Sequence, residues 1–128
     1  MALTVPAIEA SVMTALETLK SLPKVSAALK QAEKEVDRAM AEQVELCEIP
    51  APTFAETERA KSVAERMKAY GLTDVTIDEI GNVIGKRPGK GHGPILALGA
   101  HMDSVFPAGT DVTVKKEGNI YRAPGIGD

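Results

Sequence analysis

The stretch Pro94-Ile-Leu-Ala-Leu-Gly-Ala-His-Met-Asp-Ser-Val-Phe-Pro107 joins an apolar run to a histidine and a carboxylate. The run Pro94–Ala100 is short and bounded by turn residues, which predicts a central strand covered on both faces. Sheets of this kind bind ligands at the carboxyl ends of their strands, where His101 and Asp103 follow. In an extended chain these side chains point to the same side. Since neutral imidazole binds zinc and a nearby carboxylate can fix its tautomer, the pattern predicts half of a metal site.

The composition indicates a globular domain of ordinary size. The 128 residues suffice for one domain, and 44% hydrophobic with 26% charged residues is close to the average of soluble proteins. The aromatic fraction of 3%, without tryptophan, is low for a self-sufficient core and favours a fragment of a longer protein. The net charge of -3 gives no indication of binding to nucleic acid or to an anionic membrane, which attract positively charged surfaces. We therefore expect a small neutral or peptide-like partner.

The cysteine content and the N-terminus bear on the compartment. The single cysteine, Cys47, cannot form an internal disulfide, and its apolar helical context predicts a buried structural thiol. Residues Met1–Glu9 contain neither a basic region nor a long apolar run, so neither a signal peptide nor a membrane span is indicated. We expect a cytoplasmic protein.

Two helices are predicted in the first part of the chain. Residues 7–20 look helical, and Pro23 stands where a second helix can begin, because proline is tolerated in a first turn. One apolar stripe then continues to a helix end before Pro50, at spacings of three and four: Val25, Leu29, Ala32, Val36, Met40, Val44 and Cys47. Packing against a sheet is the expected role of this stripe, and a coiled-coil partner surface is the alternative.

A third helix and a hairpin are predicted next. Thr53-Phe-Ala-Glu56 has the pattern of a capping box, which would start a helix, and Gly71 stands where a left-handed residue would end it. The period then changes to two, and Gly81-Asn82 can form the turn of a hairpin between Val75–Ile77 and Val83–Ile84.

The glycine- and lysine-rich run 85–93 is predicted to be an exposed loop. It is not a phosphate-binding P-loop, because it has three rather than four residues before Gly89-Lys90 and no hydroxyl residue after the lysine. Its three cations lack the aromatic neighbours of a nucleic-acid contact. His92 lies between glycines without the rigid support that a metal ligand needs, so we assign it no metal role.

Three blocks taken together resemble one enzyme family: Gly99–Pro107, Gly109-Thr110 and Pro124-Gly-Ile-Gly-Asp128. They are similar to the metal-binding blocks of the di-zinc exopeptidases and deacylases that include peptidase T, glutamate carboxypeptidases of the carboxypeptidase G type, aminoacylase-1 and succinyl-diaminopimelate desuccinylase. Glu48–Glu56 and Asp78–Val83 resemble the family's first helix start and first strand pair less specifically. The resemblance covers about Val36 to Asp128.

The resemblance implies roles for three residues. His101 would bind one zinc ion, Asp103 would support it from the second shell, and Asp128 would bridge two zinc ions. Cobalt or manganese could replace zinc in such a site. The glutamate that acts as general base, and the remaining ligands, would lie beyond Asp128, so the isolated chain is expected to be inactive.

The implied fold is α/β, a three-layer zinc-exopeptidase-like catalytic domain with a central mixed sheet flanked by helices. Residues 23–128 would be its N-terminal part, and residues 1–22 a helical extension. The full-length protein, expected to be a homodimer, would hydrolyse amide bonds of small peptides as an aminopeptidase. Alternatives within the family are an N-acyl amino acid deacylase and a glutamate-type carboxypeptidase. An alternative of another class is a non-catalytic helical interaction module that uses the stripe from Val25 to Cys47.

Overall fold

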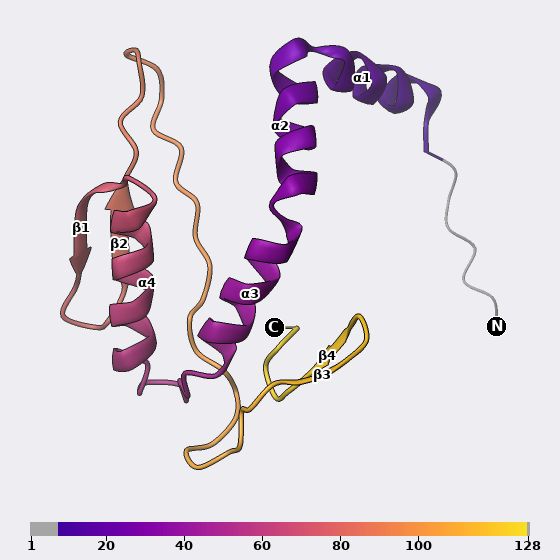
Figure 1. Ribbon diagram of the computed structural model, residues 1–128. Helices are drawn as coiled ribbons and strands as arrows, with labels where there is room; N and C mark the ends of the chain where they lie inside the picture. Colours follow the sequence, from indigo (N-terminus) through magenta and orange to yellow (C-terminus); the bar gives the residue numbers. More distant parts are fainter. Residues whose placement is uncertain (1–7, 128) are drawn as a thin grey trace. The chain divides into compact units, whose positions relative to one another are not determined.

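The computed structural model describes residues 8–127. Their helices and strands follow one another along the chain (Figure 1): α1 (Ala10–Ser21), α2 (Pro23–Lys34), α3 (Val36–Cys47), α4 (Thr57–Ala69), β1 (Thr73–Ile77), β2 (Val83–Lys86), β3 (Lys115–Glu117) and β4 (Ile120–Arg122). The chain divides into two compact units, Met1–Met40 and Ala41–Asp128, and α3 begins in the first and ends in the second.

The first unit is helical, as the sequence predicts. The helix expected over residues 7–20 is observed as α1, which begins at Ala10 and ends at Ser21. Ala7 lies outside the described residues. Leu22 is extended, with φ −61° and ψ 128°, and therefore separates the two helices. Pro23 is the first residue of α2, where its missing N–H removes no helical hydrogen bond.

The single long helix expected over Val25–Cys47 is wrong, because Glu35 divides it into α2 and α3. The Glu35 N–H donates to the Ala32 carbonyl oxygen at 3.1 Å, which replaces the α-helical bond with the tighter bond of a 3₁₀ turn. The apolar stripe continues across this one-residue break with its spacing intact. For that reason periodicity alone does not detect the break.

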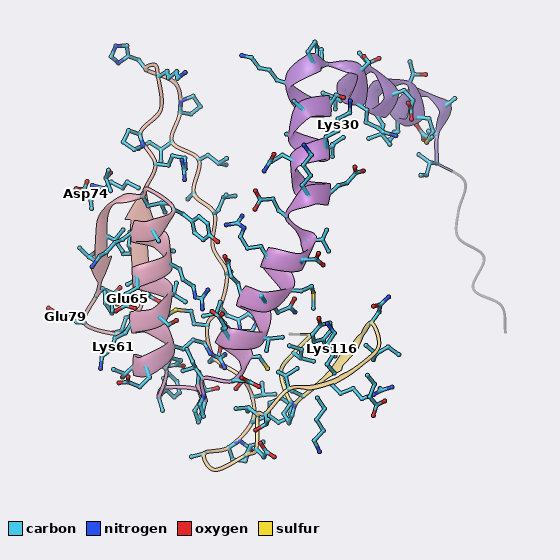
Figure 2. The ribbon with its side chains drawn as sticks, in the orientation of Figure 1. Lys30, Lys61, Glu65, Asp74, Glu79 and Lys116 are labelled. Atoms are coloured by element: carbon cyan, nitrogen blue, oxygen red, sulfur yellow. The ribbon has the colours of Figure 1, made fainter. Side chains whose placement is uncertain are left out.

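The second unit contains α4 and the β1–β2 hairpin, which lie side by side in Figure 1. The strands pair antiparallel in the register Thr76↔Ile84 and Ile77↔Val83, which confirms the predicted hairpin. Ala60 and Ala64 of α4 are buried, at 1% and 6% exposure. The charged side chains of Lys61 and Glu65 occupy the exposed face of the same helix (Figure 2). Helix α4 is therefore amphipathic.

The C-terminal end of α4 also follows the prediction. Gly71 has a left-handed φ of 76°. The Gly71 N–H donates to the Lys68 carbonyl oxygen at 2.9 Å, and the Leu72 N–H donates to the Met67 carbonyl oxygen at 3.0 Å. These two bonds are those of a Schellman motif, in which glycine avoids the steric cost of the left-handed region.

The predicted capping box is wrong, because α4 begins at Thr57, four residues after Thr53. The chain turns at Phe54, where φ is 68°, and the Glu56 carboxylate accepts the Phe54 N–H at 2.7 Å. The Thr53 hydroxyl donates instead to the carboxylate of Asp103 at 2.6 Å. A charged acceptor makes a stronger hydrogen bond than a neutral one, and here it lies 50 residues away in the sequence.

The buried strand predicted over Pro94–Ala100 is also wrong for the described chain, which has no strand there. Ile95, Leu96 and Leu98 are 97%, 82% and 90% exposed. A strand needs neighbours that accept and donate its main-chain hydrogen bonds, and local pattern cannot supply them. Two antiparallel pairs, β1–β2 and β3–β4, form the sheets of residues 8–127, so the central mixed sheet is not among them. The mixture of helix and strand is compatible with an α/β class.

The β3–β4 hairpin was not predicted from the sequence. Its register pairs Lys115 with Arg122 and Glu117 with Ile120, and Gly118 in the turn has a φ of 60°.

Among residues 8–127, no helix is long and apolar enough to cross a membrane.

Candidate functional site

The candidate site forms where the segment after the exposed apolar run meets the chain that leads into α4. The Ser104 N–H donates to the Ala51 carbonyl oxygen at 2.7 Å, within an isolated parallel bridge between Pro52 and Ser104. Ala51 and Ser104 are 1% and 5% exposed. This buried contact fixes the residues just before Ser104, which are the predicted site residues.

His101 and Asp103 lie together, as the sequence predicts. His101 Nδ1 lies 3.1 Å from Asp103 Oδ1 and 3.1 Å from the Asp103 main-chain oxygen. Both neighbours are acceptors, so they favour the tautomer that carries its proton on Nδ1 and its lone pair on Nε2. The imidazole is 60% exposed and the carboxylate 27% exposed. The pair thus presents an oriented imidazole at the surface.

Asp103 uses both carboxylate oxygens. Oδ2 accepts the Thr53 hydroxyl at 2.6 Å, while Oδ1 faces His101. The hydrogen bond from Thr53, followed by that from His101, lowers the pKa of Asp103 below its ordinary value. An ionised carboxylate is the form that holds the imidazole by accepting its proton.

Arg59 of α4 ties the same segment to the end of α3. Its Nη1 donates to the Met102 carbonyl oxygen at 2.8 Å. Its Nε and Nη2 donate to the Ile49 carbonyl oxygen at 3.1 and 2.6 Å, and Nη2 lies 3.5 Å from the Cys47 carbonyl oxygen. A guanidinium presents its donors in a rigid fork, so one side chain holds three main-chain carbonyls in fixed relation.

Asp128, the predicted bridging ligand, lies outside the described residues. The residues before it lie beside the site, because a Cβ added to Gly125 would be 3.6 Å from the Ser104 Cβ. Gln43 Nε2 donates to the Ile126 carbonyl oxygen at 2.5 Å, and Cys47 Sγ lies 3.5 Å from the Pro124 carbonyl oxygen. Two residues of α3 therefore anchor the segment that leads to Asp128.

Cys47 is buried, at 7% exposure, which confirms the predicted structural thiol. Burial raises its pKa above the ordinary value of a cysteine, because a thiolate is poorly solvated there. The thiol therefore stays protonated and packs against the Pro124 segment.

The metal site that the sequence predicts has few candidate donors among the described residues. Within 8–127 there is no group of three or more histidine, cysteine, aspartate or glutamate side chains that could hold a metal ion. The donor set of His101 and Asp103 fits one imidazole ligand oriented by a carboxylate, which is a common arrangement around zinc. His92 lies in the exposed loop. The two zinc ions and the role of Asp128 stay predictions.

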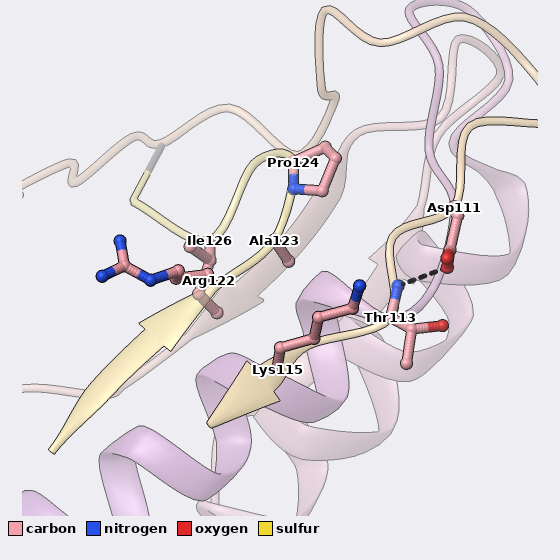
Figure 3. A pocket seen from close by; sticks show the side chains of 7 residues that line it. All are labelled: Asp111, Thr113, Lys115, Arg122, Ala123, Pro124 and Ile126. Atoms are coloured by element: carbon pink, nitrogen blue, oxygen red, sulfur yellow. Dashed lines mark hydrogen bonds between the residues drawn. The ribbon is translucent and has the colours of Figure 1, made fainter. Parts of the chain in front are cut away.

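A separate hollow lies along the β3–β4 hairpin (Figure 3). Its volume is about 450 Å³, and its lining residues are Asp111, Thr113, Lys115, Arg122, Ala123, Pro124 and Ile126. Hydrogen bonds from Thr113, drawn as a dashed line for its main-chain N–H, lower the pKa of Asp111. The hollow has no lining residue in common with the His101–Asp103 pair.

Sequence reasoning missed Thr53 as a partner of Asp103, and it missed Arg59 altogether. Thr53 was assigned to a capping box because only local partners can be read from a pattern. A signal for Arg59 existed: it stands four residues before Val63 and eight before Met67, on the apolar face of α4. A charged residue on such a face indicates a partner among buried polar groups.

Comparison with known proteins gives partial relatives. No family model matches the chain. A protein of Pyrococcus abyssi, provisionally named LysW-lysine/LysW-ornithine hydrolase, is 40% identical over 84 residues, which are 66% of this chain and 23% of that protein. Proteins of the same provisional name from Thermococcus kodakarensis and Pyrococcus furiosus are 42% and 40% identical over 60 residues, or 47% of this chain. Those alignments cover 17% and 18% of the two relatives.

The chain thus matches about a quarter of the length of the relative from Pyrococcus abyssi, and less of the other two. All three relatives are named as hydrolases.

Proposed function

We propose that residues 23–128 form the N-terminal part of the catalytic domain of a zinc-dependent amide hydrolase, preceded by a helical extension over residues 1–22. The observation that carries the proposal is the oriented pair, in which His101 Nδ1 lies 3.1 Å from the Asp103 carboxylate. The similarity to proteins named as hydrolases supports it independently. The three-layer fold with a central mixed sheet belongs to the same proposal.

Three residues of this chain would have roles in binding zinc. His101 would bind zinc through Nε2, since the neighbours of Nδ1 favour a proton on that atom. Asp103 would hold the imidazole, and Asp128 would supply a carboxylate shared by two metal ions. When bound, zinc would polarise an amide carbonyl and lower the pKa of a bound water, which makes that water easier to deprotonate for attack on the carbonyl. The general base would come from a glutamate outside these residues.

For the substrate we propose a conjugate of an amino acid, because the relatives are named for LysW-lysine and LysW-ornithine. Cleavage would release an amino acid of the lysine or ornithine type, which is close to the deacylase alternative. Aminopeptidase action on small peptides is the second candidate, since the block Gly99–Pro107 resembles peptidase T among others. A cytoplasmic homodimer without nucleic-acid or membrane partners is part of the proposal.

Substitution of His101 tests this function in the intact product of the gene. His101→Ala removes the imidazole ligand, so we expect zinc affinity and amide hydrolysis each to fall by at least about 100-fold. Zinc is measured by competition with a chelator, and hydrolysis with conjugates of lysine and ornithine and with dipeptides. Cleavage of the dipeptides alone would select the aminopeptidase.

The matched control is His92→Ala, which removes the chain's other histidine from the exposed loop. Both zinc binding and hydrolysis should stay within about twofold of the unsubstituted protein. Zinc binding and hydrolysis that survive His101→Ala would contradict the proposal. An unsubstituted protein that neither binds zinc nor hydrolyses these substrates would favour the non-catalytic interaction module.

A further inference from the structure

We infer that Thr53 and Arg59 are the positioning residues of the His101–Asp103 pair, Thr53 by holding the carboxylate and Arg59 by holding the main chain between them. Neither residue belongs to the metal-binding blocks of the resemblance. The inference rests on the proposed function for its catalytic meaning, and on the hydrogen bonds of this chain for its geometry.

The pair needs such support because the chain before it gives none. Residues 94–100 form no strand, and their large apolar side chains are exposed. His101 is therefore not held by a preceding ladder of main-chain hydrogen bonds. Hydrogen bonds from residues 51–59 hold the segment 101–104 instead: those of Ala51, Thr53 and Arg59.

Arg59 acts on the peptide unit between the two side chains. Its Nη1 donates to the Met102 carbonyl oxygen at 2.8 Å, and the residues on either side of Met102 are His101 and Asp103. The other nitrogens of the fork donate to the Ile49 carbonyl oxygen, just after α3. Since α4 and the end of α3 are both anchored by this side chain, the Met102 carbonyl cannot turn without breaking a charge-assisted hydrogen bond.

Thr53 acts on the carboxylate directly. Its hydroxyl donates to Asp103 Oδ2 at 2.6 Å, which leaves Oδ1 directed at the imidazole. A carboxylate without this bond can rotate about its terminal torsion, which has a broad energy profile. The Thr53 hydroxyl therefore holds the Asp103 carboxylate, and the carboxylate in turn holds the His101 imidazole.

The first test measures the tautomer of the His101 imidazole in zinc-free protein. At about pH 8, above the ordinary histidine pKa of about 6.5, ring ¹⁵N shifts report the tautomer. We expect the Nδ1–H form to dominate at His101 in the unsubstituted chain. Thr53→Val, which keeps the shape and removes the hydroxyl, should shift His101 toward the Nε2–H form, whereas Thr53→Ser should restore it. His92 is the internal reference, and its shifts should not change.

The second test measures zinc affinity in the intact gene product. Loss of outer-shell support typically lowers metal affinity by about 10- to 100-fold, so we expect this loss for Thr53→Val and for Arg59→Lys. Lysine keeps the charge of Arg59 but lacks the fork that reaches Met102 and Ile49 together. Matched controls are Thr76→Val in β1 and Arg66→Lys in α4, each expected within about twofold. Thermal unfolding of every variant shows that it has folded.

The outcomes separate this inference from the proposed function. An unchanged tautomer in Thr53→Val, together with unchanged zinc affinity in both Thr53→Val and Arg59→Lys, would overturn the inference, while zinc-dependent hydrolysis could persist. A tautomer change in a protein that binds no zinc would support the positioning and overturn the hydrolase. A change in only one of the two variants would overturn the part assigned to the other residue.

Discussion

Asp78 illustrates at the scale of single residues how a carboxylate organises the main chain of this protein. Its Oδ1 accepts the Ile80 N–H at 3.1 Å and the Asn82 N–H at 2.8 Å, and its Oδ2 accepts the Asn82 side-chain amide at 2.8 Å. The hydrogen bond from the Asn82 side chain is the main cause that lowers the pKa of Asp78. The ionised form is therefore the form that holds the β1–β2 turn.

Substitution Asp78→Ala should destabilise the hairpin in a pH-dependent way. Because folding lowers this pKa from its ordinary value of 3.8, the ionised group stabilises the folded chain above that value. The stabilisation is lost as the pH falls through the lower pKa of the folded state. We expect the variant to unfold at lower urea than the unsubstituted chain at pH 6, and the two to converge near pH 2.

The matched control for this prediction is Glu79→Ala, which removes the neighbouring exposed carboxylate labelled in Figure 2. It should change the urea midpoint little at either pH. A difference between Asp78→Ala and the unsubstituted chain that is equally large at pH 6 and pH 2 would show that the charge of Asp78 is irrelevant to the turn.

At the scale of elements, α4 and its hairpin hold together through a close contact at Gly85. A Cβ added there would lie 2.9 Å from Leu72 Cδ2 and 3.2 Å from Met67 Sδ. These atoms are ends of flexible side chains from the Schellman turn of α4, so a small group can be accommodated and a branched one cannot.

The substitution Gly85→Val should therefore destabilise the second unit by about 1–3 kcal/mol, the usual cost of overpacking. Gly85→Ala should stay within about 1 kcal/mol, because a smaller unfolded-state entropy offsets part of the contact. Gly89→Val is the control, since a Cβ at Gly89 meets nothing within 4 Å. Equal urea midpoints for Gly85→Val and Gly89→Val would show that Gly85 is not packed against α4.

The elements that the sequence predicts well are those whose determinants are local. Gly71 ends α4 and Gly81 lies in the hairpin turn, both with positive φ, and both signals lie next to the structure they specify. The prediction of a capping box was wrong because the Thr53 hydroxyl donates to Asp103, which is too far away in the sequence to be read from a local pattern. His101 and Asp103 were predicted together because they are two residues apart, whereas Arg59 reaches Met102 across 43 residues.

At the scale of the whole molecule, the prominent feature is the uncovered run Pro94–Ala100. The sequence correctly identifies it as apolar, but the elements that would cover a central strand cannot be read from its own residues. Ile95, Leu96 and Leu98 are each more than four-fifths exposed. Contiguous exposed apolar side chains with unpaired main-chain groups favour association with other chains.

We expect the 128-residue chain to self-associate as its concentration rises, through this run. Ile95→Thr should lower the association measured by sedimentation velocity, because it removes a 97% exposed apolar side chain from the run. Ile80→Thr makes the same chemical change at an 84% exposed turn residue outside the run and should have a smaller effect. Equal effects of the two substitutions would assign the association to general hydrophobicity.

The division of the chain at Met40 has a consequence for how the protein can vary. Residues 51–59 donate or accept hydrogen bonds that orient Asp103 and the main chain beside His101, and Gln43 and Cys47 donate hydrogen bonds that anchor the segment before Asp128. None of these residues belongs to the first unit. These particular hydrogen bonds involve no residue of α1 or α2, so the sequences of the two helices can vary without altering any of them.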